Sequence, residues 1–261
     1  MIGKIRKIKF IWATGRSKSL ISYLRSKGVS IGENVHFFGD TRLVRVDTTR
    51  PSLVRIGNNV RIVSPFTLLT HGFEWTVFRE KYHEILGSCG KVVIGNNVYI
   101  GRETCILKGT KIGDNVIIGA KSLVNKDIPS NCVAVGIPAK EIMGIDEYFE
   151  KRKKEYIEEA KEYAYSIYEV FGRMPVQEDF FEFFPLFLKR DEKSIRDFNE
   201  RLRRKMKKDN RRVRSIQSQL GPAFGNFINS QPYYESFEAF LMDAGIPVEK
   251  GQKNRIFSFL L

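Results

Sequence analysis

Aliphatic residues return at every sixth position through the middle of the chain. The series runs Ile94, Ile100, Ile106, Ile112, Ile118 and Val124. Four positions after each of them stands a small or β-branched residue, namely Val98, Thr104, Thr110, Val116, Ser122 and Ile128. A helix repeats about every 3.6 residues and a strand about every two, so neither produces a period of six. The pattern predicts short strands joined by corners, with two inward-facing positions in each hexad.

Glycine and asparagine occupy the corners of this pattern. Glycine follows four of the six aliphatic residues, at Gly95, Gly101, Gly113 and Gly119. Both residue types accept a positive φ at low cost, which a sharp corner requires. Three strands and three corners close a prism with about eighteen residues per coil, and each coil covers the apolar face of the next. We therefore expect a parallel β-helix.

The same pattern begins near residue 31 and is interrupted once. Ile31-Gly32 and Ile56-Gly57 start earlier coils, and the two inward registers continue through Phe37, Leu43, Ile62 and Leu68. Leu43 and Ile56 are one residue too far apart for two hexads, which predicts a small bulge or loop near residues 47–51. The 26 positions from Leu68 to Ile94 do not fit the register. Residues 73–91 are therefore expected to leave the prism as a loop, which we call the excursion.

Residues 31–140 resemble the hexapeptide-repeat acyltransferases, and the closing run is similar to that of their sugar and polysaccharide O-acetyltransferase branch. That run reads Ile118-Gly119-Ala120-Lys121-Ser122-Leu123-Val124-Asn125-Lys126-Asp127-Ile128-Pro129, then Val135-Gly136-Ile137-Pro138-Ala139-Lys140. The resemblance implies a left-handed coil, a homotrimer and acetyl-CoA as acyl donor. No metal is expected, because the three cysteines show no CxxC spacing. A left-handed coil runs against the usual handedness of parallel connections, so only the resemblance implies it. The implied activity is acetylation of a hydroxyl on a saccharide, such as a surface polysaccharide or a lipid-linked glycan precursor.

The resemblance also implies a general base. His71 is the fourth residue of the hexad that starts at Leu68, where the resembled family has its catalytic histidine. An imidazole can take a proton from a sugar hydroxyl and return it to the leaving thiolate. Family members often have an acidic residue directly after this histidine, whereas Gly72 follows here, so Glu74 is the candidate that would orient the ring. The alternative is a surface histidine at a turn and a solvated loop glutamate.

The other histidines and the cysteines are alternative candidates for catalytic roles. His36 and His83 are interpreted as structural, although His83 falls inside the excursion, where it could touch a substrate. A γ-class carbonic anhydrase, which shares the β-helix, would need three histidines around zinc, and the spacing of the only three in this chain does not match. Cys89 has no activating neighbour in the sequence and is read as an inert thiol.

Five residues form the donor site that the resemblance implies. Gly101 and Ala120 lie at corners where a small side chain lets the backbone approach the pantetheine arm. Asn125 and Lys126 align with a Thr-Lys pair of the family, so threonine is replaced by asparagine in this chain. Lys140 aligns with a terminal cation that neutralises the phosphates of the donor.

Beyond Lys140 the period of six gives way to helical patterning. Apolar residues at helical spacing predict a helix over residues 146–171 that stops at Gly172. Further helices are expected over residues 178–189, 193–219 and 233–244, and the phenylalanines between 180 and 187 form either a core or an exposed interaction patch. The expected domains are a basic N-terminal helical segment (1–30), a β-helix (31–144) with the excursion, and a helical region (145–261). The expected fold class is mainly β, a left-handed parallel β-helix with flanking helices.

The chain is strongly basic, and its charge is concentrated in two segments. Lys and Arg number 44 against 30 Asp and Glu, a formal net charge of +14. Residues 1–32 contain eight basic and no acidic residues, and residues 189–214 contain thirteen basic and five acidic ones. The second segment fits a solvated helix face, an anionic membrane leaflet or a phosphorylated glycan. Nucleic acid is disfavoured because no recognisable nucleic-acid module accompanies the charge.

Composition bounds the class of protein. A hydrophobic content of 42% excludes wholesale disorder, and no apolar run is long enough for a membrane span or a signal peptide. We expect a cytoplasmic protein with three reduced cysteines. Residues 2–12 mix apolar and cationic side chains, which fits a helix capping the first coil or a peripheral contact with the inner face of an anionic membrane.

Two other functions stay open at this point. An N-acyltransferase acting on a nucleotide-linked amino sugar would use the same scaffold and donor, and an amine needs a base less than a hydroxyl does. A non-catalytic trimeric scaffold would use the basic flanks for binding. The sequence leaves the identity of the acceptor open.

Overall fold

The structure is a computed structural model that describes residues 17–208 and 215–248. The chain divides into two compact units, residues 1–150 and residues 151–261. The boundary falls inside one long helix, α4 (Ile145–Phe171), which leads from the end of the first unit into the second.

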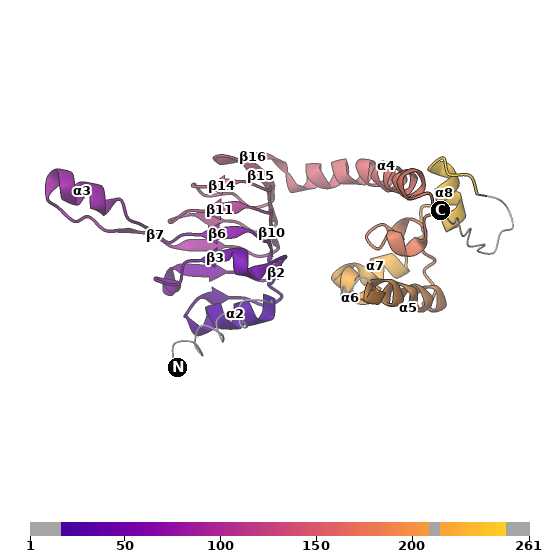
Figure 1. Ribbon diagram of the computed structural model, residues 1–261, viewed down its shortest axis with the longest axis horizontal. Coiled ribbons are helices and arrows are strands. Elements are labelled where there is room, and N and C mark those ends of the chain that lie inside the picture. Colours follow the sequence, from indigo (N-terminus) through magenta and orange to yellow (C-terminus); the bar gives the residue numbers. More distant parts are fainter. Residues whose placement is uncertain (1–16, 209–214, 249–261) are drawn as a thin grey trace, which may run out of the picture. The chain divides into compact units, whose positions relative to one another are not determined.

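The first unit is a parallel β-helix with three sheets, whose strands stack as rungs in Figure 1. Sheet A consists of β1 (Ser30–Ile31), β4 (Val54–Ile56), β9 (Val92–Ile94) and β12 (Lys111–Ile112). Sheet B consists of β16 (Ala139–Gly144), β15 (Cys132–Gly136), β13 (Val116–Ile118), β10 (Val98–Ile100), β5 (Arg61–Val63) and β2 (His36–Phe38). Sheet C consists of β14 (Leu123–Val124), β11 (Thr104–Ile106), β6 (Phe66–Leu68) and β3 (Val44–Val46). Neighbouring strands are parallel except in the closing hairpin of β15 and β16.

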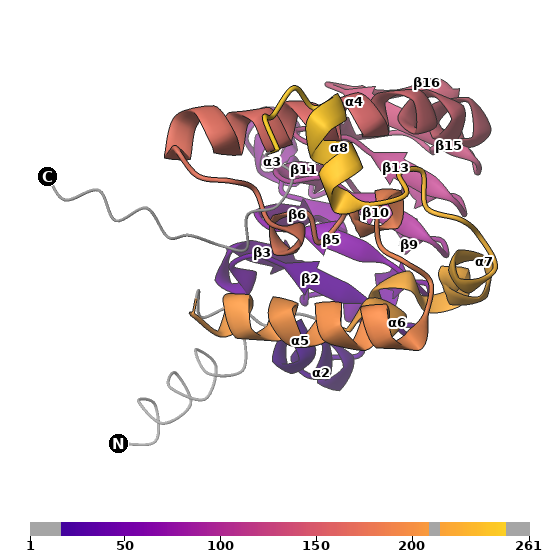
Figure 2. The same cartoon turned by 90° about the vertical axis from the view of Figure 1, so that its right-hand side faces the viewer.

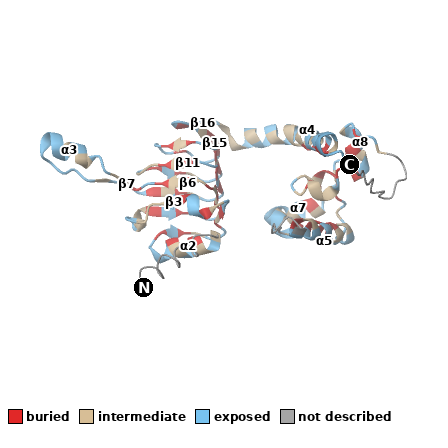
Figure 3. Ribbon diagram, viewed as in Figure 1, coloured by how far each residue is buried: buried red, intermediate tan, exposed pale blue. Residues whose placement is uncertain are grey.

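The period of six is confirmed by burial. All twelve residues of the two predicted inward series are buried, and the most exposed of them, Ile128, shows 5% of its surface. Figure 3 shows buried positions recurring along the strands of the coil. Each coil buries its aliphatic residues against the next coil, so the stack is held together mainly by removal of apolar surface from water.

The corners impose two structural requirements, a positive φ and a close approach of adjacent coils. Asparagine supplies the positive φ at the corner between sheets A and B, between +54° and +62° at Asn34, Asn59, Asn97, Asn115 and Asn131, whereas Glu103 and Lys121 take it at the corner before sheet C. The glycines of the repeat meet a different demand, because adjacent coils approach closely where they lie. A Cβ atom on Gly95, for example, would lie 2.5 Å from the carbonyl oxygen of the next coil's glycine. The corner asparagines also link the coils through side-chain hydrogen bonds of 2.8 Å.

One predicted inward position is wrong. Leu43 lies in a 3-10 turn, η1 (Thr41–Leu43), and 44% of its surface is exposed. The carboxylate of Asp40 accepts a hydrogen bond from the Arg42 amide and starts this turn. The turn moves the register by three residues, because Val46 and not Leu43 is aligned with Leu68. Val44 and Val46 consequently pair with Phe66 and Leu68. Val46 and Ile56 are ten positions apart, four more than a hexad, and the chain between them contains two bends and a second 3-10 turn, η2 (Pro51–Leu53).

The coil is interrupted where a loop was expected over residues 73–91, and the inserted segment contains a helix and two short strands. Two short antiparallel strands, β7 (His71–Gly72) and β8 (Ser88–Cys89), form its base, and the coil resumes at β9. Between them lies α3 (Trp75–Tyr82), none of whose residues is buried. Figure 1 shows this arm projecting away from the coil.

A helix covers the first coil. Leu20 and Leu24 of α2 (Ser17–Ser26) are buried in the same core as Ile31 and Phe37. Solenoids need such a cap because their end coils would otherwise expose an apolar face. Residues 2–12, for which a capping or membrane-surface helix was expected, lie outside the described residues.

The described part of the second unit contains helices and turns and no strand, so "mainly β" applies only to the first unit. The helix expected over residues 146–171 is confirmed as α4, and Gly172 follows it with a φ of +59°. The remaining helices are α5 (Glu192–Lys208), α6 (Ile216–Leu220), α7 (Phe224–Ile228) and α8 (Phe237–Asp243), with a 3-10 turn, η5 (Gly221–Ala223), between α6 and α7. Figure 2 shows α4 and α8 on one side of this unit and α5, α6 and α7 on the other.

The helix expected over residues 178–189 is wrong. Two 3-10 turns, η3 (Gln177–Asp179) and η4 (Phe184–Leu186), stand in its place. Pro185 provides no N–H for a helical hydrogen bond, and three phenylalanines, Phe180, Phe184 and Phe187, are all buried. The phenylalanine cluster is therefore the core of this unit and not an exposed patch.

The helix expected over residues 193–219 is divided into α5 and α6, and residues 209–214 between them lie outside the described residues. The one expected over residues 233–244 begins later, at the Ser236 cap of α8. Among the described residues, no helix is both long enough and apolar enough to cross a membrane.

Candidate active site

A histidine and a carboxylate meet at one corner of the β-helix. The Nδ1 atom of His71 lies 2.5 Å from Oδ2 of Asp47. His71 stands at the start of the excursion, in β7, whereas Asp47 follows β3 in the preceding coil. The histidine side chain is 14% exposed and that of the aspartate 5% exposed, so solvent screens the pair only weakly.

The β-ladder explains why these two residues meet. Val46 of β3 is paired with Leu68 of β6, and the Asp47 amide donates to the Leu68 carbonyl at 3.0 Å. The chain then needs only two more residues after Leu68 to bring His71 over the Asp47 side chain. Asp47 was not identified as a site residue from the sequence because Leu43 was taken as the inward-facing position of this coil. A register through Val44 and Val46 would have placed Asp47 at the same corner as His71.

Two threonines hold the Asp47 carboxylate. Thr70 donates to its Oδ2 through both the amide, at 3.2 Å, and the hydroxyl, at 2.5 Å. Thr49 donates to its Oδ1 through the amide, at 2.9 Å, and the hydroxyl, at 2.7 Å. Burial alone would raise the pKa of Asp47, but the hydrogen bonds from Thr70, Thr49 and His71 outweigh it and hold the pKa well below its usual value.

This carboxylate determines the tautomer of the neutral imidazole. An ionised carboxylate only accepts hydrogen bonds, so Nδ1 of His71 must carry the proton. Nε2 is then left with its lone pair and can accept a proton from another molecule. The edge of the ring is further held by Phe73, whose ring centroid lies 5.1 Å away in an edge-on arrangement.

Glu74, the residue suggested to orient the ring, has other partners. Its carboxylate contacts the ammonium of Lys108 and the hydroxyl of Ser88. These contacts, the one from Lys108 first, lower the pKa of Glu74 to about 2. Glu74 therefore joins the base of the excursion to the neighbouring coil, and the carboxylate at the imidazole is Asp47. A Cβ atom on Gly72 would lie 1.9 Å from Oε2 of Glu74, so a larger residue there would displace the Glu74 side chain from these partners.

The other two histidines lie elsewhere. His36 is in β2 of sheet B, where its ring contacts Phe38 with the centroids 5.1 Å apart. His83 takes a left-handed conformation directly after α3 and is exposed. Within the described ranges, no group of three histidine, cysteine or acidic side chains could hold a metal ion.

The three cysteines are free thiols in different environments. Cys89 is exposed, and burial raises the pKa of the Cys105 and Cys132 thiols. The raised pKa keeps the Cys105 and Cys132 thiols protonated, which makes them poor nucleophiles.

The residues predicted for the donor lie at the ends of sheet C and beside it. Asn125 and Lys126 directly follow β14, whose Val124 is aligned with Ile106 and, through it, with Leu68. They are exposed at the same corner of the prism from which His71 departs, two coils further on. Lys140 is exposed on the edge strand β16.

Gly101 and Ala120 are stacked at the opposite end of sheet C, where β11 and β14 begin. A Cβ atom on Gly101 would lie 2.4 Å from the Ala120 amide nitrogen. Glycine is therefore needed at 101 for coil stacking alone, independently of any bound donor. Ala120 is exposed and is free to face one.

Comparison with known proteins places this coil in a family. Residues 91–126 match the family model described as bacterial transferase hexapeptide (six repeats). Protein CapG of Staphylococcus aureus is 37% identical over 125 residues, which cover 71% of that protein and 48% of this chain. The chain belongs to the hexapeptide-repeat transferases. Galactoside O-acetyltransferase of Escherichia coli is a further relative of this hexapeptide transferase, 38% identical over 140 residues, which cover 64% of its length and 48% of this chain.

Among solved structures, a maltose O-acetyltransferase from Clostridium difficile is similar to this transferase. The match has 26% sequence identity and a TM-score of 0.38, and it covers 54% of this chain and 85% of that one. All three relatives account for about half of the transferase.

Proposed function

We propose that this protein is an acetyl-CoA-dependent O-acetyltransferase that acetylates a hydroxyl group of a saccharide, with His71 as general base. The observation that carries the proposal is the contact between Asp47 and His71 at a corner of a hexapeptide coil. Relatives named as galactoside and maltose O-acetyltransferases support the choice of a sugar hydroxyl as acceptor.

In this proposal His71 moves one proton twice. Its Nε2 accepts the proton of the sugar hydroxyl while the oxygen forms a bond to the thioester carbonyl carbon. The carbon–sulfur bond then breaks, and the imidazolium returns the proton to the leaving thiolate. Asp47 keeps Nδ1 protonated throughout and stabilises the transient imidazolium by its negative charge.

The donor substrate would lie along sheet C in this proposal. Lys126 and Lys140 supply exposed positive charge for its phosphates, and Asn125 supplies a side-chain amide at the same corner. The backbone at Gly101 and Ala120 offers a narrow surface at the other end of the sheet. A left-handed coil, as in the resembled family, is part of the same proposal.

We further propose that the active protein is a homotrimer. The arm carries five apolar side chains that are each more than half exposed: Phe73, Val77, Tyr82, Ile85 and Leu86. Such a concentration of exposed apolar surface marks an interaction site, and a second copy of the chain would cover it. Light scattering should then give three times the chain mass of 30.2 kDa, and a monomer would contradict this part of the proposal.

A matched pair of histidine variants tests the chemistry. His71→Asn should reduce transfer by about 100-fold or more, since general base catalysis contributes on the order of 10²–10⁴. His83→Asn is the control, because asparagine tolerates the left-handed conformation of that residue. Thiol release from acetyl-CoA is measured with galactosides and maltose as hydroxyl acceptors and glucosamine as an amine acceptor.

Three results decide the proposal. Loss of transfer in His71→Asn alone, with CoA binding retained by calorimetry, supports it. Near-normal turnover in that variant rejects His71 as the base. Preference for the amine acceptor replaces the O-acetyltransferase with an N-acyltransferase.

A further inference from the structure

One face of α5 carries a row of positive charge. At about 100° of rotation per residue, Lys193, Arg196, Glu200, Arg203, Arg204 and Lys207 fall within one arc of about 100°. All six are exposed, and we call them the α5 stripe. The opposite face is anchored in the core of the second unit by Ile195, Phe198, Leu202 and Met206.

Most of this charge is uncompensated. Within the described ranges, Lys193, Arg203 and Lys207 form no ion pair. Arg204 lies 3.5 Å from the one carboxylate of the stripe, Glu200. From Lys193 to Lys207 the row is about 21 Å long at the helical rise of 1.5 Å per residue. A row of this kind attracts an extended anionic partner.

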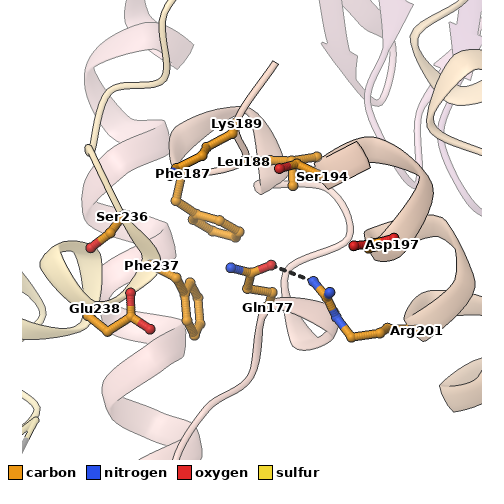
Figure 4. A pocket seen from close by; sticks show the side chains of 10 residues that line it. All are labelled: Gln177, Phe187, Leu188, Lys189, Ser194, Asp197, Arg201, Ser236, Phe237 and Glu238. Carbon is orange, nitrogen blue, oxygen red and sulfur yellow. Dashed lines mark hydrogen bonds between the residues drawn. The ribbon is translucent and has the colours of Figure 1, made fainter. Parts of the chain in front are cut away.

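A polar pocket of about 330 Å³ runs beside the stripe. Ser194, Asp197 and Arg201 of α5 line it on one side, in directions next to those of Lys193 and Arg204 around the helix. Lys189, Gln177 and Glu238 line it from other elements, and Figure 4 shows these side chains around the cavity. The Arg201 guanidinium donates to the side-chain oxygen of Gln177 at 2.7 Å.

The pocket offers donors and acceptors of both charges. Lys189 and Arg201 are cations, Asp197 and Glu238 are carboxylates, and Gln177 and Ser194 are neutral. Such a mixture suits a ligand rich in hydroxyl groups, each of which donates and accepts. Its volume lies at the lower end of the range of small-ligand sites, about 300–1,000 Å³.

We propose that the pocket and the α5 stripe together bind a segment of an acidic glycan. The pocket takes one sugar unit through its hydroxyl groups, and the stripe binds carboxylate or phosphate groups of neighbouring units, for which the planar forks of Arg196, Arg203 and Arg204 are suited. This inference rests on the proposed function and deepens it, because it names a negatively charged saccharide as the class of acceptor.

Two features favour a glycan over other anionic partners. The α5 stripe holds no apolar side chain that could insert into a lipid layer, and a concave polar pocket has no counterpart on a flat membrane. The aromatic residues of the pocket, Phe187 and Phe237, are buried, so they offer no open ring on which a nucleic-acid base could stack.

Binding to defined probes tests the inference in the full-length chain. The probe is an oligogalacturonate of about ten sugars, and a maltooligosaccharide of the same length is the neutral control. Vesicles of mixed phosphatidylglycerol and phosphatidylcholine, and a single-stranded oligonucleotide, are the competing polyanions. Binding is measured without acetyl-CoA, in the wild type and in His71→Asn, so a failure of the proposed chemistry does not affect the result.

Matched variants identify the site. Arg203→Glu should weaken oligogalacturonate binding about fivefold or more, and adding Lys207→Glu should weaken it further. Lys154→Glu makes the same change of charge on the exposed side of α4 and should leave binding within about twofold. Glu238→Trp, which fills the pocket, should weaken binding while the stripe is intact.

The outcomes are distinct. Tighter binding of the acidic than of the neutral oligosaccharide, lost in the stripe and pocket variants and retained in His71→Asn, supports the inference. Equal binding of both oligosaccharides, or equal losses in Arg203→Glu and Lys154→Glu, overturns it. Binding of vesicles or of the oligonucleotide without binding of oligogalacturonate assigns the stripe to those partners and also overturns it.

Discussion

The Asp47 carboxylate lies 2.5 Å from Nδ1 of His71, although 24 positions separate the two residues in the chain. The β-helix brings them together because one coil places residue 47 directly below the point where the next coil leaves the prism. Four hydrogen bonds from Thr49 and Thr70 hold the carboxylate in place. The carboxylate is thus built into the stack of coils, whereas its partner His71 lies in β7 at the base of the arm.

Asp47→Asn should remove the control of the imidazole tautomer. The amide can donate to Nδ1 and so favours the tautomer with the proton on Nε2, which cannot act as a base. We expect kcat to fall about 100-fold or more, with KM for acetyl-CoA little changed. Asp114→Asn is the matched control, since Asn58 and Asn96 already make the equivalent contact in earlier coils. Equal loss in both variants would show that Asp47 acts only through stability.

Glu74→Gln distinguishes the two acidic candidates at the active site. Glu74 contacts Lys108 and Ser88 at the base of the arm, and its side chain is 42% exposed. Solvent screens a pair exposed to this extent, so it contributes little to stability. We expect kcat to fall by less than about tenfold, far less than in Asp47→Asn. Steady-state kinetics of the two variants side by side would refute this order if Glu74→Gln were the more damaging.

Gly95→Ala tests the close approach of the coils. A methyl group at residue 95 would lie 2.5 Å from the carbonyl oxygen of Gly113, so a backbone must move. We expect a loss of about 1–3 kcal/mol in the free energy of unfolding. Gly87→Ala, with no atom within 4 Å of the added methyl, should be neutral or slightly stabilising. Urea unfolding of both variants checks the prediction, which requires that only Gly95→Ala lower the midpoint.

The lowered pKa of Asp179 predicts that the second unit loses stability in acid. Burial would raise its pKa, but hydrogen bonds from Arg173, Lys205 and the Val176 amide outweigh burial and lower the pKa to about 2. Because this value lies below the 3.8 of an unperturbed aspartate, the ionised group stabilises the fold by about 2 kcal/mol above pH 4. That contribution is lost as the pH falls from about 4 towards 2.

Asp179→Asn should therefore lower stability at neutral pH and flatten its dependence on acid. The helical circular dichroism signal during urea unfolding, followed from neutral pH to about pH 3, reports mainly on the second unit. The mechanism would be excluded by parallel losses of stability in the wild type and the variant over this range.

Much of the first unit could be predicted from periodicity, because every coil repeats the same local demand. The inward position of Ile94 or Ile118 follows from spacing alone. The 26 positions between Leu68 and Ile94 are not a multiple of six, and this break in the repeat predicted where the arm leaves the coil. The structural reason for each corner glycine was harder to predict from the sequence. Positive φ was expected for it, whereas the contact between Gly95 and Gly113 exists only once two coils are stacked.

The second unit was harder to predict because its helices do not repeat. The phenylalanines around Pro185 have helical spacing, yet burial in a shared core and the missing proline N–H produce two short turns instead. The position of the α5 cations was visible in the sequence. Their lack of partners and the pocket beside them depend on which residues the fold brings near.

The amino-acid sequence by itself determined the period of six, the family resemblance and the choice of His71, because these depend on residue type and local spacing. Only the tertiary structure decided that Asp47, and not Glu74, holds the imidazole. A shift of three residues, from Leu43 to Val46, changes which side chains share a corner, and the energies of short-range hydrogen bonds depend on that placement.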